Sequence, residues 1–397
     1  MRPEELDFLL GPAGAAVLDE LAAEPLTPDS HLAIAERLRA RLTPDLANAA
    51  LELALLRRKA EAKFSRAGRM FFTRDGLEQA TAEPLAQYRA RRYAEAGASL
   101  VADMGCGIGG DALALAGAGA TVMAIDREWV HAVMTAANAA VYDLRAAVLP
   151  VQADLTELSP PAVDAFFFDP ARRTAGGPRQ APRRRLHSVN EYRPPLSLID
   201  EWRPRVPRGA VKVSPAIDYA ELPAGVEAEF VSFNGEVREG VLWYGDLRSA
   251  ARRATLLPGG HTLTDREPER LELGPPRRFL YEPDGAVIRA HLVSQLAHRI
   301  NASRLDPAIA YLAADEAIAT PFARAYAIED HFPFQLKRLR SYLRERDIGA
   351  VTIKKRGSPL DPDTLRQALR LRGESQCTIF LTQVAGRATV LIGRPVD

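Results

Sequence analysis

Cysteine is nearly absent from this chain, whose 397 residues include only Cys106 and Cys377. Two thiols cannot form a disulfide framework or a cysteine metal cluster, and the seven histidines show no spacing typical of a metal site. No apolar run is long enough to cross a membrane, and the N-terminal segment carries Glu4 and Glu5 where a signal peptide needs an apolar core. We therefore expect a cytoplasmic protein without a resident metal or a membrane partner.

A large excess of charge of one sign is also lacking, because 52 basic and 51 acidic residues leave a formal net charge of +1. The balance is uneven, however, and residues 277–397 contain 19 basic and 13 acidic side chains. This excess is compatible with an acidic partner such as nucleic acid, although many solvated protein faces show as much. The length of the chain predicts two or three domains.

Glycines at alternate positions mark the most informative stretch. An apolar run from Leu100 ends in an acid, Asp103, and Gly105, Gly107 and Gly109 follow it before a helical pattern begins. This order predicts a buried strand, a tight turn and a helix start. A backbone without Cβ atoms can turn sharply and lie against a ligand, and the new helix offers unpaired N–H groups. A tight turn in any doubly wound sheet is the alternative.

Four predicted strands each end in an aspartate. The strands cover residues 100–103, 121–126, 147–154 and 163–168, and the acids are Asp103, Asp126, Asp154 and Asp169. Each aspartate alone could be a helix cap, but together they favour a site, because ligands bind at the carboxyl edge of open α/β sheets. If the site binds a nucleoside cofactor, Asp126 is placed to accept hydrogen bonds from its two ribose hydroxyls. Asp154 could accept one from its adenine amino group. A fifth strand at 210–215 and two strands joined by Asn234-Gly235, a favoured hairpin pair, complete the sheet.

The flanking regions differ in composition from this sheet. Residues 1–95 repeat apolar side chains at helical spacing and predict a small helical domain. Within it, residues 63–81 interleave aromatic and basic side chains, which either stack on nucleic acid or, as we favour, pack onto the neighbouring domain. Thr81 could instead cap the far end of a cofactor. Residues 171–210 form a long Arg-rich connection, and residues 251–276 are rich in proline and glycine.

The order of these motifs resembles bacterial class I S-adenosylmethionine (SAM)-dependent methyltransferases with a C-terminal THUMP-like domain. The stretches that carry the resemblance are residues 71–81, the glycine loop, Asp169–Arg173, Leu280–Asp284 and Thr352–Gly357. It implies an α/β fold with a Rossmann-like seven-stranded sheet. The implied domains are helical (1–95), methyltransferase (96–250), linker (251–276) and THUMP-like α/β (277–397).

The resemblance also implies SAM as the cofactor. The residues that it assigns to SAM are Asp103, Gly105, Cys106, Gly107, Gly109, Asp126, Asp154 and Thr81. The motif Asp169-Pro170-Ala171-Arg172 is distantly similar to that of trimethylguanosine synthases, which carry Asp/Asn-Pro-Pro and an aromatic residue. Ala171 and Arg172 depart from that pattern.

We therefore expect methyl transfer from SAM to a base nitrogen of RNA, either tRNA or rRNA, as the resemblance to THUMP-containing enzymes implies. Asp169 and the Pro170 carbonyl would orient the target amine. The residues expected to contact RNA are Arg172, Arg173, Arg183, Arg184, Arg185, Lys354, Lys355 and Arg356. Lys212 with Asp169 leaves ribose 2′-O-methylation open. A small-molecule methyltransferase and a retired enzyme that only binds RNA or protein are further alternatives. The sequence predicts no oligomeric state.

Overall fold

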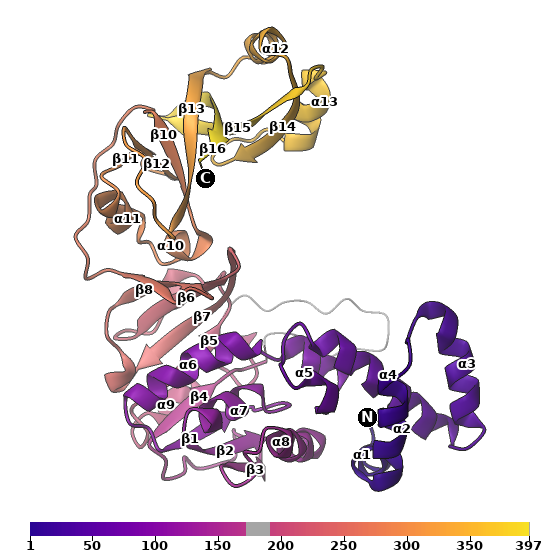
Figure 1. Ribbon diagram of the computed structural model, residues 1–397. Helices are drawn as coiled ribbons and strands as arrows, with labels where there is room; N and C mark the ends of the chain where they lie inside the picture. The colour runs from indigo at the N-terminus through magenta and orange to yellow at the C-terminus, as the bar shows by residue number, and fades with distance from the viewer. Residues whose placement is uncertain (172–190, 397) are drawn as a thin grey trace. The chain divides into compact units, whose positions relative to one another are not determined.

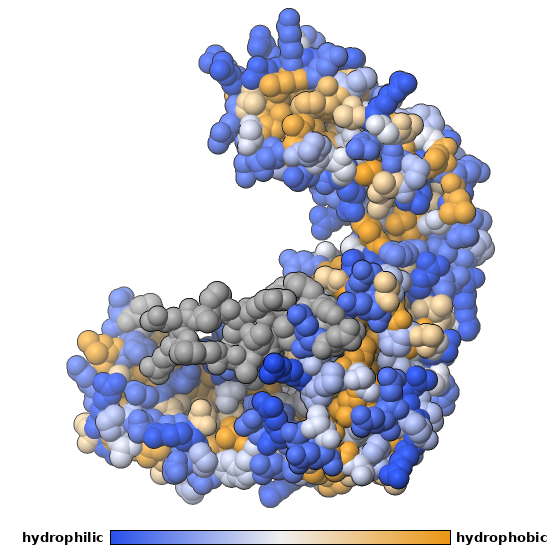
Figure 2. Space-filling view, turned by 180° about the vertical axis from the view of Figure 1, so that it is seen from behind, coloured by the Kyte–Doolittle hydropathy of each residue, from blue (hydrophilic) through white to orange (hydrophobic). Residues whose placement is uncertain are grey.

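The computed structural model describes residues 1–171 and 191–396 (Figure 1). The chain forms two compact units. The first contains Met1–Val226 and Val241–Ser249, and the second contains Glu227–Gly240 and Ala250–Asp397. Among the described residues, no helix is long and apolar enough to cross a membrane. Hydrophilic residues dominate the face shown in Figure 2, with smaller apolar areas between them.

The first unit begins with helices whose starts follow from local sequence. These are α1 (Pro3–Leu10), α2 (Pro12–Ala22), α3 (Pro28–Arg39) and α4 (Pro44–Ala60). Each has proline in its first turn, where the missing N–H costs nothing, and the hydroxyls of Thr27 and Thr43 cap α3 and α4. The predicted helical N-terminus is confirmed.

One sheet of the described residues has nine strands, two more than the seven that the resemblance implies, and its order begins β3-β2-β1-β4-β5-β7. Its first five strands pair in parallel. The six strands of this part are β1 (Leu100–Met104), β2 (Thr121–Asp126), β3 (Val148–Gln152), β4 (Ala165–Phe168), β5 (Gly209–Val213) and β7 (Glu236–Tyr244). Strands β4 and β5 are buried throughout, as parallel strands covered on both faces should be.

Helices α5 (Arg74–Gln79) and α6 (Glu83–Glu95) precede β1. Helix α7 (Gly110–Gly117) follows β1, α8 (Trp129–Val141) follows β2, and α9 (Leu198–Trp202) comes between β4 and β5 in the chain. Strands and helices therefore alternate from β1 to β3, as the sequence predicts. Helix α7 contacts β2, and α8 contacts β2 and β3 (Figure 1). The strand order and the parallel pairing confirm the Rossmann-like fold.

The second unit contains β6 (Glu227–Phe233), which turns into β7 at Asn234 and Gly235. Both turn residues have positive φ, 53° and 79°, as the predicted type I′ turn requires. The order here is β7-β6-β8-β9. Strands β8 (Arg252–Leu257) and β9 (His261–Thr264) occupy part of the expected connection at 251–276, because Pro258-Gly259-Gly260 forms a hairpin turn rather than a linker.

A second sheet of the same unit has the order β11-β12-β10-β13-β16-β15-β14. Its strands are β10 (Phe279–Pro283), β11 (Ser303–Asp306), β12 (Ile309–Ala314), β13 (Ala323–Pro333), β14 (Ile348–Lys355), β15 (Ser375–Val384) and β16 (Arg387–Pro395). The sheet curls so that the turn after β15 lies beside β11, which is at the other end of the strand order. A hydrogen bond of 3.1 Å from Ala385 N to Leu305 O joins them.

The helices of this unit are α10 (Gly285–Arg289), α11 (Val293–Arg299), α12 (Leu336–Glu345) and α13 (Pro362–Leu369). Residues 286–300 do not form one continuous helix. His291 has a positive φ of 56°, which interrupts the helix and separates α10 from α11.

Candidate active site

The glycine loop joins β1 to α7 with left-handed backbone at all three alternate glycines. The φ angles of Gly105, Gly107 and Gly109 are 82°, 54° and 87°. A Cβ on Gly109 would lie 2.9 Å from the side chain of Thr135, whereas a Cβ on Gly107 would meet no described atom within 4 Å. Gly105 and Gly107 are therefore needed for their positive φ rather than for lack of space. Among the described residues, the loop faces open space at Gly107.

Asp126 ties the end of β2 to this loop. Its Oδ2 accepts a hydrogen bond from Gly107 N at 2.9 Å, and its Oδ1 accepts one from Glu128 N at 2.9 Å. His131 Nδ1 lies 3.1 Å from the same Oδ1. Burial of the imidazole opposes its protonation, but the hydrogen bond and charge of Asp126 outweigh burial and raise the pKa of His131.

Asp103 lies beneath the loop with 1% of its surface exposed. Among the described residues, its Oδ2 has no hydrogen-bond partner. Burial, reinforced by the nearby charges of Asp111, Asp169 and Asp126, raises the pKa of Asp103 well above its usual range. A buried carboxyl oxygen that the protein leaves without a partner fits a ligand that brings its own donor.

Asp154 is exposed and forms a local turn. Its Oδ1 accepts hydrogen bonds from Thr156 N at 2.9 Å and Thr156 Oγ1 at 2.6 Å, which hold the pKa of Asp154 below its usual value. No helix follows Asp154 in the described residues before β4, so the helix cap that the sequence left open as an alternative is not present either. A contact of Asp154 with a nucleoside stays a prediction.

A buried polar cluster joins Thr81, Lys212 and Asp169. Lys212 Nζ donates to Asp169 Oδ2 at 2.6 Å and to Thr81 Oγ1 at 2.7 Å. Lys212 and Thr81 are 4% and 5% exposed. The carbonyl oxygen of Asp169 would lie 3.6 Å from a Cβ on Gly105, so the end of β4 borders the glycine loop. The structure thus brings together Asp169, the loop and Thr81.

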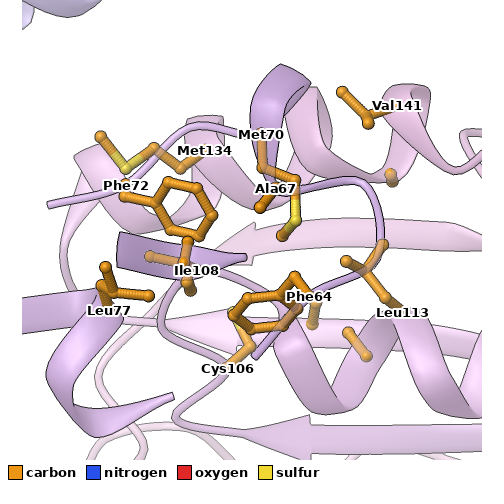
Figure 3. Packing of buried hydrophobic residues seen from close by; sticks show 14 of the residues in the cluster. Phe64, Ala67, Met70, Phe72, Leu77, Cys106, Ile108, Leu113, Met134 and Val141 are labelled. Carbon is orange, nitrogen blue, oxygen red and sulfur yellow. The ribbon is translucent and has the colours of Figure 1, made fainter. Parts of the chain in front are cut away.

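The segment at 63–81 packs onto the loop, as the favoured interpretation predicted. Phe64 and Phe72 are buried together with Ile108 and Cys106 (Figure 3). Lys63, which the alternative assigned to nucleic acid, donates instead to backbone carbonyls of Leu77, Glu78 and Ala80.

Polar residues on α8 support the site but were not singled out from the sequence. Asn138 is fully buried, and its Nδ2 donates to Ile108 O at 2.9 Å and Phe71 O at 3.1 Å, while its Oδ1 accepts from Phe71 N at 2.7 Å. Thr135 Oγ1 donates to Gly107 O at 3.1 Å. His131, Thr135 and Asn138 are spaced by four and three residues, so they share one helix face. That spacing in an otherwise apolar helix is the signal that could have revealed them.

A buried ion pair under the sheet was also missed. Arg89 on α6 is 2% exposed and pairs with Asp111 on α7, and its guanidinium lies 5.0 Å from the centre of the Phe167 ring. It supports the start of α7, where Asp111 lies. A lone arginine in an amphipathic helix carries no signal for such a role.

The residues predicted to contact RNA divide into two groups. Arg172, Arg173, Arg183, Arg184 and Arg185 lie outside the described residues. In the second unit, Lys354 pairs with Glu282, and Arg356 lies 5.4 Å from the centre of the Tyr311 ring, whereas Lys355 is exposed. Burial opposes the charge of Lys354, but Glu282 and Tyr326 raise the pKa of Lys354 above its usual value.

Three family models match parts of the chain. An RNA cap guanine-N2 methyltransferase model matches residues 98–188, and a THUMP domain-like model matches residues 323–395. A domain of unknown function matches residues 2–60. The first match includes the glycine loop, Asp126, Asp154 and Asp169.

Whole-chain similarity agrees with these matches. An uncharacterized SAM-dependent methyltransferase of Mycobacterium tuberculosis, found in two strains, is 36% identical over 365 residues, which cover 87% of this chain and 96% of the relative. The fold is also similar to the crystal structure of a Porphyromonas gingivalis W83 protein proposed to be a methyltransferase. That match covers 100% of this chain and 100% of the other, with a TM-score of 0.76 and 20% sequence identity.

SAM carries an ammonium group and ribose hydroxyls, which are donors of the kind that the unpartnered oxygen of Asp103 and the carboxylate of Asp126 accept. The open space in front of Gly107 leaves room for them. The residues that surround the glycine loop therefore fit the cofactor. On its similarity along nearly the whole length of the mycobacterial relative, this chain belongs to the SAM-dependent methyltransferases and carries a THUMP-like region at its C-terminal end.

Proposed function

We propose that this methyltransferase modifies a nitrogen of an RNA base, with an exocyclic amino group as the favoured target. The observation that carries the proposal is the placement of Asp169 and Pro170 at the carboxyl end of β4, beside the glycine loop. Bound SAM supplies an electrophilic methyl group. The carboxylate of Asp169 and the Pro170 carbonyl accept hydrogen bonds from the amine and so direct its lone pair towards that methyl.

Ribose 2′-O-methylation is less well supported. A hydroxyl acceptor needs a base to remove its proton, and Lys212 would have to be that base. Lys212 is instead buried and engaged by Asp169 and Thr81, so its Nζ would have to give up one of these partners to take the proton of a hydroxyl. Pyrimidine C5 methylation also lacks support, because burial raises the pKa of Cys106 well above its usual value and that of Cys377 to about 11.

RNA as the substrate is supported by the two family matches and by charge. One matching family acts on an RNA cap, and the other is described as THUMP domain-like. In the second unit the excess of basic residues lies within residues 334–374, which hold 11 basic and 5 acidic side chains. The remainder of 277–397 is balanced.

The proposal is tested with total RNA from a strain that lacks the gene. We expect the purified enzyme to transfer labelled methyl groups from SAM to this RNA, and mass spectrometry of the digested nucleosides to identify a methylated base. Asp169→Asn should lower the rate on the order of 100-fold, the cost of misplacing a reactant, while calorimetry shows wild-type SAM affinity.

Asp164→Asn is the matched control. Asp164 precedes the opposite end of β4 and accepts hydrogen bonds from Ser99 and Leu100. We expect its loss to lower stability but not turnover per folded molecule. A label found on ribose oxygen, or an Asp169→Asn variant with full activity, would overturn the base-nitrogen proposal.

A further inference from the structure

Lys212 is an unusual residue for its strand. The other residues of β5 are Gly209, Ala210, Val211 and Val213, and all are buried. Burying an ammonium group costs several kcal/mol of solvation, and a buried ion pair seldom stabilises a fold more than apolar side chains of similar volume would. An apolar residue would therefore satisfy this position at least as well as lysine if only folding were at stake.

The contacts of Lys212 point towards the acceptor side of the site. Its Nζ holds Asp169 Oδ2 at 2.6 Å, and that bond fixes the direction of the carboxylate relative to β5. A second bond of 2.7 Å to Thr81 Oγ1 fixes Nζ itself. The cation also stabilises Asp169 as a carboxylate, the form that accepts hydrogen bonds from an amine on both oxygens.

Thr81 connects this arrangement to the cofactor side. Its carbonyl oxygen would lie 3.7 Å from a Cβ on Gly110, the first residue of α7. The preceding segment is held on the glycine loop by the buried rings of Phe64 and Phe72 and by Asn138. Thr81 thus lies beside the start of α7 and bonds the lysine that holds Asp169.

We propose that Lys212 is a positioning residue of this methyltransferase. Thr81 fixes the position of Lys212 Nζ relative to the glycine loop. Lys212 keeps Asp169 oriented and charged, so that Asp169 directs the acceptor amine. The amine nitrogen would gain the methyl group as the sulfur–methyl bond of SAM breaks and S-adenosylhomocysteine leaves, and it would release its proton to water rather than to Asp169. This inference rests on the proposed function, because it assigns Asp169 to the acceptor.

The test compares Lys212→Met, Lys212→Arg, Thr81→Val and Thr81→Ser in the full chain. We expect Lys212→Met to lower kcat on the order of 100-fold, with SAM affinity measured by calorimetry unchanged. Without the cation, the acidic limb of the pH–rate profile should move upward by roughly one to three pH units, because Asp169 protonates more readily. Lys212→Arg should restore part of kcat and return the acidic limb towards its wild-type position. Thr81→Ser should retain a higher kcat than Thr81→Val, because serine keeps the hydroxyl that bonds Lys212 Nζ.

A role confined to folding predicts something different, namely a lower melting temperature with an unmoved acidic limb. That result, or a full kcat in Lys212→Met, would overturn the inference. Asp169→Asn separates the two proposals. If Asp169→Asn is inactive while Lys212→Met is active, only the role of Lys212 fails, whereas an active Asp169→Asn variant removes the proposed function itself.

Discussion

Asp103 is predicted to bind the cofactor, and at the scale of one residue that role would cost stability. The fold places its carboxyl group in a buried position and, among the described residues, leaves Oδ2 without a donor. Unsatisfied buried polar groups destabilise proteins by about 1–3 kcal/mol each. The ligand-free protein therefore carries a cost that a bound donor removes.

Asp103→Asn tests this account. A carboxyl whose folded pKa is raised contributes less stability as pH increases above its unfolded value of about 3.9, because the unfolded chain then loses its proton first. The amide cannot titrate. We expect the melting temperature of the ligand-free variant at neutral pH to exceed that of wild type, while SAM affinity measured by calorimetry falls by about 1.5–3 kcal/mol. Equal melting temperatures at every pH would contradict it.

His131 also has a raised pKa, but burial opposes that shift and a charged partner produces it, whereas burial raises the pKa of Asp103. The folded pKa of His131 is raised, so the stability from its contact with Asp126 is present below the unfolded pKa of about 6.5 and lost as pH rises through the folded value. His131→Gln should remove that part of the pH dependence. Urea unfolding of both proteins on either side of neutrality measures the difference. Comparing them cancels His291, whose pKa is lowered by burial and by Arg252 and Arg289.

At the scale of elements, α8 fastens the segment at 63–81 to the glycine loop. Asn138→Leu would leave two carbonyls and one N–H of Phe71 and Ile108 without their partner in a buried position. We expect a loss of about 2–4 kcal/mol in the free energy of unfolding and weaker SAM binding. Asn48→Ala, at an exposed position on α4, is the control and should change stability by less than about 0.5 kcal/mol. Equal effects of the two changes would show that Asn138 has no such role.

Elements set by local pattern were predictable from the sequence, and those set by distant contacts were not. The strands before Asp103, Asp126 and Asp169 appear as apolar runs, and Asn234-Gly235 specifies its own turn. Strands β8 and β9 were missed because Pro-Gly-Gly serves linkers and hairpins alike.

The same limit applies to side chains. Lys212 bonds Asp169, which is 43 residues away along the chain, and Thr81, which is 131 residues away. Lys354 is 72 residues from its partner Glu282. No periodicity in the sequence connects residues at such separations. The aspartates at the strand ends could be found, but the cations and hydroxyls that hold them could not.

At the scale of the whole molecule, the basic excess is concentrated on one layer of the second unit. Helices α12 and α13 contact each other and the edge strand β14, and residues 334–374, which contain all three, carry a net charge of +6. Lys354 and Arg356 are engaged with Glu282 and Tyr311 and are only partly exposed. If this unit binds RNA, the exposed side chains of α12 are better placed to do so.

The last prediction tests that layer through the exposed residues Lys337, Arg338 and Arg344 of α12. Changing all three to glutamine should weaken binding of bulk tRNA and lower the slope of log affinity against log salt by roughly 0.7–0.9 for each phosphate that the variant no longer neutralises. The matched control changes three exposed arginines of the same unit outside the layer, Arg278, Arg299 and Arg324. Both triple variants remove three charges, so a general electrostatic effect would weaken binding equally. We expect a reduced slope only in the α12 variant, with SAM affinity unchanged in both because the glycine loop is untouched. Equal slopes for wild type and the α12 variant would exclude this layer as the RNA-binding surface.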